Sequence, residues 1–409
     1  MRSWAGRIAA IGFGLALCMP IMRPALVSWP TPVALAVAQT SEERTPRTIR
    51  VGKEYPVKTI TAAARLARDG DTVEIAAGDY VGDTAVAVWT QGNLEIRGIN
   101  GRPRLVAAGQ AVEGKGIWVI RGGDIVVENI EFTGARVPDR NGAGIRLDRG
   151  KVTIRRCVFT DNENGMLVGN DPSTILEIED SEFGDNGAGD GQSHNLYVGT
   201  IQRFVVQGSY FHRARLGHLL KTRAQDNLIK YNRLSDEPGG RASYELEFPF
   251  GGLAHVVGNL IEQSEGTENS TIVSFGAEGY KWPRNELYLS HNTIVNNRAM
   301  GGVFIRVYQG SAYVKAINNI LVGKGDLDIR SRGQEVSEDR RVDLNDFVLP
   351  GRFDFRPKKA SRAAGTAKDP GEAGGMSLRP TREYTYPVGT APLPPTRSLI
   401  PGAFQNVAK

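Results

Sequence analysis

The sequence repeats one short apolar pattern eight times, and this repeat limits the choice of fold more than any other feature. Each copy has an apolar residue, usually a small or amide residue three positions later, and a large apolar residue two positions after that. The copies are Val127-Ile130-Phe132, Ile154-Cys157-Phe159, Ile178-Ser181-Phe183, Val206-Ser209-Phe211, Ile229-Asn232-Leu234, Val256-Asn259-Ile261, Leu289-Asn292-Ile294 and Ala316-Asn319-Leu321. They end 27, 24, 28, 23, 27, 33 and 27 residues apart. These intervals predict a solenoid of short strands, with one coil in each interval.

The strands of such a solenoid pair in parallel from coil to coil, about 4.8 Å apart, so equivalent residues form columns. Asn232, Asn259, Asn292 and Asn319 fall into one column at a turn. Amides stacked in this way can hydrogen-bond along the column and satisfy the turn backbone. We therefore interpret these asparagines as structural. Leucine-rich repeats and propeller blades fit the intervals less well.

A short helix is predicted near the start of the repeats. In residues 59–68, Ile60, Ala63, Ala64 and Ala67 form a small apolar stripe that could cap the open end of the solenoid. The run Thr59-Ile60…Gly70-Asp71-Thr72-Val73…Gly78-Asp79-Tyr80 and the coils after it resemble the right-handed parallel β-helix superfamily of pectate lyases and related carbohydrate-active proteins. The resemblance covers roughly residues 47–325. It implies an all-β, single-stranded β-helix of about ten coils.

The two ends of the chain differ in composition from the repeats. Arg2 and Arg7 precede an apolar run, and small residues stand at positions 34, 36 and 38. We expect residues 1–38 to be a signal peptide, and the protein to be periplasmic or extracellular. Cleavage would leave Cys157 as the only cysteine, without a disulfide partner in the chain. We expect residues 326–357 to be a cap or irregular, and residues 358–409 to be a disordered or extended tail.

The net charge of +5 favours an acidic partner. The sequence has no Lys/Arg-rich run, zinc-ligand spacing or recognition-helix pattern, so nucleic acid is not an expected partner. We expect a monomer that binds an acidic polysaccharide and has no membrane contact after signal removal. No metal-ligating residues are predicted and no cofactor is expected, although the sequence leaves calcium open.

Candidate functional residues fall on an earlier strand of each coil, where the alternation predicts which side chains point outward. The predicted outward column is Arg146, Leu167, Tyr197, Lys221, Glu247, Phe275 and Arg306, with Asn195, Glu245 and Arg223 beside it. His194 and His218 fall in the inward register with Tyr244, where we expect buried stacking with a hydrogen-bond partner. His194 also lies at a strand entrance, from which it could reach a groove. The long 33-residue coil contains a predicted rim loop in which Tyr280 and Trp282 could stack on sugar rings.

This set of residue types matches the needs of β-elimination on a uronic-acid polymer. A cation holds the carboxylate and acidifies the neighbouring C–H group, a base removes that proton, and an acid protonates the leaving oxygen. We cast Lys221 as the base, Arg223 as the carboxylate clamp and Tyr197 as the acid. Asn195, Arg146, Tyr280, Trp282 and Arg306 are the expected substrate-binding residues.

A finer resemblance supports this assignment. The run Lys221-Thr222-Arg223…Asn227…Tyr231-Asn232-Arg233-Leu234 is similar to polysaccharide lyase family 6, which includes alginate and chondroitin-B lyases. In that family a lysine one strand before a Tyr-Asn turn serves as the base, which implies Lys221 here. The chain departs from the family on the following coil, where an arginine is expected and Glu245 and Glu247 stand instead.

Three other functions fit the same residues. Glu245 and Glu247 lie two positions apart, with Cβ atoms roughly 6.5–7 Å apart, a distance that can serve glycoside hydrolysis. A C5-uronate epimerase would share the first step of the lyase reaction. The third alternative is a glycan-binding or structural β-helix without catalysis. Catalytic candidates are therefore Lys221, Tyr197, Arg223, Glu245, Glu247 and His194.

Overall fold

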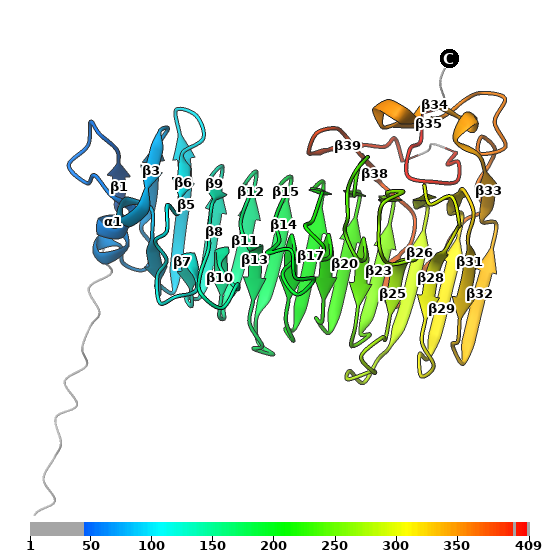
Figure 1. Ribbon diagram of the computed structural model, residues 1–409, viewed down its shortest axis with the longest axis horizontal. Helices are drawn as coiled ribbons and strands as arrows, with labels where there is room; N and C mark the ends of the chain where they lie inside the picture. The colour runs from blue at the N-terminus through cyan, green and yellow to red at the C-terminus, as the bar shows by residue number, and fades with distance from the viewer. Residues whose placement is uncertain (1–44, 396–397, 407–409) are drawn as a thin grey trace, which may run out of the picture. The chain divides into compact units, whose positions relative to one another are not determined.

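A computed structural model describes residues 45–395 and 398–406, and the predicted signal peptide lies outside them. In each coil the chain passes through three short strands, and every strand pairs in parallel with its equivalent in the next coil. Figure 1 shows the resulting ranks of strands, running from β1 beside α1 at one end to β33 at the other. Among the described residues, no helix is long and apolar enough to cross a membrane.

The first strand of each coil contributes to the sheet that we name sheet A. Its twelve strands in the described part of the chain are β1 (Thr48–Val51), β2 (Thr72–Ala76), β5 (Asn93–Ile99), β8 (Asp124–Glu128), β11 (Lys151–Arg155), β14 (Ile175–Glu179), β17 (Arg203–Gln207), β20 (Asp226–Lys230), β23 (Leu253–Val257), β26 (Glu286–Ser290), β29 (Tyr313–Ile317) and β32 (Gly333–Ser337).

Sheet B follows after a tight turn. Its eleven described strands are β3 (Asp79–Val81), β6 (Arg104–Val106), β9 (Glu131–Thr133), β12 (Val158–Thr160), β15 (Glu182–Gly184), β18 (Tyr210–His212), β21 (Arg233–Ser235), β24 (Leu260–Gln263), β27 (Thr293–Asn296), β30 (Ile320–Val322) and β33 (Arg340–Val342).

Sheet C completes the coil. Its ten described strands are β4 (Ala87–Trp89), β7 (Gly116–Ile120), β10 (Ala143–Leu147), β13 (Asn164–Val168), β16 (Leu196–Val198), β19 (Leu220–Thr222), β22 (Leu246–Phe248), β25 (Thr271–Phe275), β28 (Val303–Val307) and β31 (Asp326–Ile329). The predicted all-β parallel solenoid is therefore confirmed.

Aromatic side chains from successive coils stack inside the solenoid. The rings of Phe132, Phe159, Phe183 and Phe211 follow one another with centroids 5.0, 4.6 and 4.9 Å apart and nearly parallel planes. These spacings match the separation of paired strands, so each ring covers the ring of the coil before it. The last residues of the repeat pattern thus form a continuous apolar column in the core.

The predicted asparagine column is present at the turn between sheets A and B. The backbone N and Nδ2 of Asn232 both donate to Oδ1 of Asn259. Asn259 donates to Asn292 through the same two groups, and Asn292 donates to Asn319 in the same way. Asn319 makes the same pair of bonds to Oδ1 of Asp339, at 2.8 and 3.0 Å. This amide ladder satisfies turn groups that the strands leave without partners.

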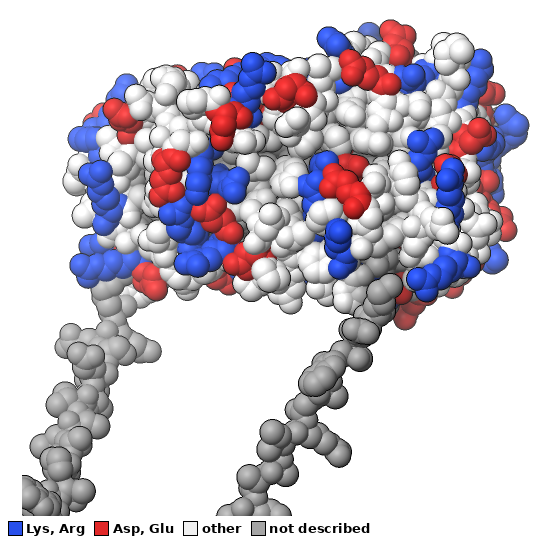
Figure 2. Space-filling view, turned by 60° about the horizontal axis from the view of Figure 1, so that its bottom comes forward, with Lys and Arg blue, Asp and Glu red and all other residues white. Residues whose placement is uncertain are grey.

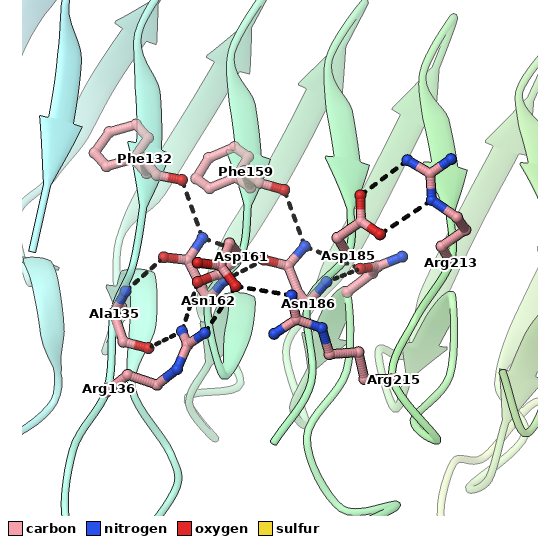
Figure 3. A network of polar contacts seen from close by, with 11 residues as sticks. Phe132, Ala135, Arg136, Phe159, Asp161, Asn162, Asp185, Asn186, Arg213 and Arg215 are labelled. Carbon is pink, nitrogen blue, oxygen red and sulfur yellow. Dashed lines mark hydrogen bonds and ion pairs between the residues drawn. The ribbon is translucent and has the colours of Figure 1, made fainter. Parts of the chain in front are cut away.

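A second amide contact lies at the turns between sheets B and C. The Nδ2 of Asn162 donates to Asn186 Oδ1, and both amides also donate to carbonyls of the coil before them (Figure 3). On the outside of these turns, Asp161 Oδ1 accepts from Arg136 and Arg215, at 2.8 Å each. Buried amides and exposed ion pairs therefore join neighbouring coils along the same edge.

The two ends of the solenoid are closed differently. At the N-terminal end, helix α1 (Ile60–Leu66) is capped by Thr59, whose Oγ1 accepts from the Ala62 N–H, and it buries Ile60 and Ala63. At the other end, Arg341 pairs with the inward-facing Leu321 of the coil before it. Its guanidinium carbon lies 5.7 Å from the Phe304 ring centre, and its Nη1 donates to the Gly325 carbonyl at 2.6 Å. A polar residue thus covers the last apolar layer.

The chain beyond the coils is folded, in contrast to the predicted disordered or extended tail. The coils continue past 325 to β33, and the chain then forms η2 (Leu344–Asp346), β34 (Phe347–Leu349), η3 (Pro350–Arg352) and β35 (Asp354–Pro357). Two hairpins follow: β36 (Glu372–Ala373) with β37 (Met376–Ser377), and β38 (Arg382–Tyr384) with β39 (Thr390–Pro392).

This C-terminal segment is held by contacts that its composition conceals. Leu378 is buried in a cluster with Tyr231, and the Tyr231 hydroxyl accepts from Thr381 N at 3.0 Å. The buried Arg233 guanidinium lies 3.8 Å from the ring centre of Phe353. A few well-spaced apolar and aromatic residues thus anchor a chain rich in glycine, alanine and proline.

The last rung of the amide ladder predicts a pH effect on stability. Burial raises the pKa of Asp339 from 3.8 to about 6, outweighing the opposing hydrogen bonds from Asn319. The folded state holds this proton more tightly than the unfolded state does. Protonated Asp339 therefore contributes fully to the free energy of unfolding below pH 4, and this contribution is lost as the pH rises towards 7. Asp339→Asn keeps the Oδ1 acceptor without a charge. We expect this variant to exceed the wild type in unfolding free energy by about 2 kcal/mol at pH 8 and by little at pH 4.

Urea unfolding at the two pH values measures this difference. Asp326→Asn, at an exposed aspartate of β31, is the control. An equal effect of Asp339→Asn at both pH values would contradict the account.

Candidate functional site

The predicted outward column lies on sheet C. Tyr197 of β16 pairs with Lys221 of β19, and Lys221 pairs with Glu247 of β22, so these three side chains come from adjacent strands. The next members of the column are Ser274 and Arg306. Phe275 was assigned to this column and is one residue out of register, because it pairs with Phe248 and is buried in the core.

Lys221 and Arg223 converge on one carboxylate, that of Glu278. Lys221 Nζ lies 3.2 Å from Glu278 Oε1, and Arg223 contacts both carboxylate oxygens through Nη2 at 2.6 Å and one through Nε at 3.2 Å. Lys221 Nζ also lies 3.3 Å from Glu247 Oε2. Both cationic side chains are largely buried, with 12% and 13% exposed. We call Lys221 and Arg223 the carboxylate clamp.

Aromatic rings support the clamp. The Arg223 guanidinium carbon lies 5.1 Å from the ring centre of Tyr197 and 4.9 Å from that of Phe250. Arg223 Nη1 donates a hydrogen bond to the Tyr197 hydroxyl oxygen. The phenolic hydrogen of Tyr197 therefore remains available for another acceptor. Cation–π contacts of this kind fix the orientation of a guanidinium.

Two histidines line the inner side of the clamp. His218 Nε2 lies 2.8 Å from Glu247 Oε2, and the His218 backbone N–H donates to His194 Nδ1 at 3.0 Å. Burial lowers the pKa of both imidazoles, in His218 against the opposing Glu247 contact. Burial raises the pKa of Glu247, but the contacts with His218 and Lys221 outweigh it and leave that pKa below its usual value. At neutral pH two neutral histidines therefore support an ionised Glu247.

The two histidines are buried and stacked, as predicted: 3% of His194 and 6% of His218 is exposed, their ring centres lie 4.5 Å apart, and the His218 ring centre lies 5.0 Å from that of Tyr244. Each also contacts the outer cluster, because the His194 ring lies 5.8 Å from the Tyr197 ring and His218 contacts Glu247.

Asn195 and Glu245 are buried, although both were expected to point outward. Asn195 Oδ1 accepts from Asn186, and its Nδ2 donates to the His212 carbonyl at 2.8 Å. Glu245 has no exposed surface, and Gln263 Nε2 donates to its Oε2 at 3.3 Å. Both residues precede three-residue strands, so they belong to the preceding turn. Glu245 therefore cannot form a surface carboxylate pair with Glu247.

Of the two aromatic residues predicted to stack on sugar rings from the long coil, Tyr280 differs from the prediction. The Tyr280 hydroxyl donates to the Phe275 and Tyr308 carbonyls, and its ring packs on Phe275, so Tyr280 is not free to stack on a sugar. The half-buried Trp282 lies beside the clamp, with its Nε1 donating to the Arg223 carbonyl at 3.0 Å. It therefore holds the backbone at the end of β19.

The arginines at the ends of the column are paired with acids. Arg146 Nε donates to Asp148 at 3.1 Å, and Arg306 Nε lies 3.4 Å from Asp328. On the face that Figure 2 shows, charges of both signs gather in mixed clusters with uncharged surface between them. Lys221 and Arg223 are more buried than Arg146 and Arg306, whose side chains are 28% and 32% exposed.

Two cavities lie against the C-terminal segment. One, of about 340 Å³, has Glu262, Asn297 and Phe353 in its wall, and the other, of about 500 Å³, has Tyr384 and Tyr386. Within residues 45–395 and 398–406, no group of three or more His, Cys, Asp or Glu side chains could hold a metal ion.

Glu278 was missed from the sequence. It lies 57 residues after Lys221, in the extra residues of the long coil. The length of that coil marked an insertion, but no local pattern showed which side chain would reach the clamp.

No protein-family model matches the sequence. No curated protein matches it either. Among solved structures, pectate lyase Pel9A matches with a TM-score of 0.53 and 13% identity, over 88% of this chain and 97% of the lyase. The chain therefore has a right-handed parallel β-helix fold, like that of the lyase. At this identity the likeness concerns the fold alone.

A second match is ORF18 of Geobacillus virus E2, with a TM-score of 0.48 and 12% identity. It covers 71% of this chain, which spans 60% of the viral protein.

The burial of Glu245 generates a stability prediction. Burial and the nearby Asp236 charge raise the pKa of Glu245 well above 4.5, so the fold favours its protonated form. The stability that protonated Glu245 contributes is therefore complete at low pH and is lost as the pH rises. We expect Glu245→Gln to raise the melting temperature at pH 8 by about 2–4 °C and to change it less at pH 5.

Calorimetric melting at both pH values checks this, with Glu265→Gln, at an exposed glutamate of a neighbouring turn, as the control. A lower melting temperature for Glu245→Gln at pH 8 would show that the glutamate is needed in its ionised form.

Proposed function

We propose that the outer face of sheet C binds a uronate-containing polysaccharide and cleaves it by β-elimination. The observation that carries the proposal is the convergence of Lys221 and Arg223 on a single carboxylate. A guanidinium and an ammonium placed in this way match the carboxylate of a uronate ring. The fold supports the proposal, because the outward column of sheet C runs across several coils, along which a polymer can lie.

The contacts of Lys221 favour a binding role over the role of base. Its Nζ lies 3.3 Å from Glu247 and 3.2 Å from Glu278, so Lys221 already serves as a carboxylate-binding group in the free protein. We therefore assign Lys221 and Arg223 jointly to the substrate carboxylate. Their charges stabilise the negative charge that develops when the neighbouring C5–H bond breaks.

Tyr197 is the group best placed to move the proton. Its oxygen is held by Arg223, the residue that would hold the substrate carboxylate. Once its phenolic hydrogen has passed to solvent, the Tyr197 oxygen takes the C5 proton, the C4–O4 bond breaks as the C4=C5 bond forms, and the phenol returns the proton to the O4 leaving group. The reaction needs no co-reactant. An epimerase would share the first step and return the proton to C5 instead.

The other functions receive less support. Hydrolysis by Glu245 and Glu247 requires two accessible carboxylates, and Glu245 is fully buried. Binding without cleavage needs only the clamp, so loss of the Tyr197 hydroxyl should affect it little while the ring remains beside Arg223. Residues 1–38 are proposed to direct the protein to the periplasm or the outside of the cell.

Four proteins separate these roles: the wild type, Lys221→Ala, Lys221→Arg and Tyr197→Phe. Each is mixed with polygalacturonate, alginate or hyaluronate, and the ultraviolet absorbance of the C4=C5 product is followed. We expect Lys221→Ala to lose at least about 10²-fold in rate through loss of charge stabilisation. Lys221→Arg keeps the cation and should stay within about tenfold of the wild type, whereas Tyr197→Phe should lose about 10²–10⁴-fold.

An equal loss in Lys221→Arg and Lys221→Ala would instead make Lys221 the base, as the sequence resemblance implies. Absence of the unsaturated product from every polymer, with binding retained, would favour a glycan-binding protein.

A further inference from the structure

Glu278 stands where the proposed ligand carboxylate would bind. Its two oxygens receive contacts from Lys221 and Arg223 that leave no unshared carboxylate position between these two cations. Arg223 and Lys221 are mostly buried, whereas 39% of the Glu278 side chain is exposed. The acidic partner is therefore the one that can leave the site without opening the fold.

The backbone around Glu278 suits an exchange of its side chain. Gly276 and Gly279 have positive φ angles of 88° and 83° and form the turn that presents Glu278. On the far side of this turn, Tyr280 is fixed by its bonds to two carbonyls. The Glu278 N–H also donates to the Pro249 carbonyl at 3.0 Å. The side chain can therefore rotate into solvent while its backbone stays in place.

The charge of Glu278 determines which ligand group can take its place at Lys221 and Arg223. Burial raises the pKa of Glu278, but the contacts with Arg223 and Lys221 outweigh this effect and hold its pKa below the usual value, so the side chain is ionised at neutral pH. Removing it leaves two mostly buried cations that Glu247 alone would have to compensate. A neutral sugar offers no replacement charge, whereas a uronate carboxylate restores it.

We infer that Glu278 is a resident carboxylate that a uronate ligand must displace from Lys221 and Arg223. This inference rests on the proposed function, in which those two residues bind the substrate carboxylate. Glu278 then has two effects. It lowers the apparent affinity for every acidic ligand, and it makes the site selective for carboxylated over neutral sugars, since only the former can exchange with it.

The test compares Glu278→Gln with the wild type, with Glu268→Gln as a matched control. Glu268 is also a loop glutamate paired with an arginine, Arg241, but it lies outside the clamp. Isothermal titration calorimetry measures binding of sodium glucuronate and of glucose. We expect Glu278→Gln to bind glucuronate about tenfold more tightly. In this variant no carboxylate occupies Lys221 and Arg223, so the state that can bind the ligand is no longer a minor one. Glucose binding should not change, and Glu268→Gln should match the wild type.

Arg223→Ala separates failure of this inference from failure of the proposed function. If Arg223→Ala abolishes glucuronate binding while Glu278→Gln binds it no better than the wild type, the clamp holds carboxylates but Glu278 does not compete for it. If Arg223→Ala binds glucuronate as well as the wild type does, the proposed clamp itself is wrong. Absence of glucuronate binding by Glu278→Gln would overturn both.

Discussion

The parallel pairing of equivalent strands is the constraint on which the rest of the structure depends. Each coil presents the same backbone groups to the next, so a side chain at one position meets its equivalent about 4.8 Å away. Inside, this spacing stacks phenyl rings; at the turns it joins amides into a ladder. On the outer face of sheet C the same register brings Tyr197, Lys221 and Glu247 together from three coils.

The columns could be predicted because they depend only on the coil interval and on strand alternation. The amide ladder and the order of Tyr197, Lys221 and Glu247 follow from these two regularities. The prediction failed for Asn195 and Glu245, where it extended alternation beyond three-residue strands. A turn residue has its own backbone geometry, and its side chain can point inward whatever the parity of the strand that follows.

Glu278 shows a different limit of sequence reasoning. Its position depends on how an inserted loop folds back over strands that lie more than fifty residues earlier in the chain. No periodicity carries that information. The C-terminal segment is a similar case, because its attachment depends on a few side chains such as Leu378 that find partners on the finished solenoid.

The clamp is electrostatically complete in the free protein, and this property connects its stability with its proposed chemistry. Lys221 and Arg223 are mostly buried and need an anion, which Glu278 supplies. The measurement that tests this account most directly is a crystal structure of Tyr197→Phe with a bound uronate oligosaccharide. The account predicts a uronate carboxylate between Lys221 and Arg223, with Glu278 turned into solvent. An oligosaccharide bound elsewhere, with Glu278 still held by both cations, would contradict it.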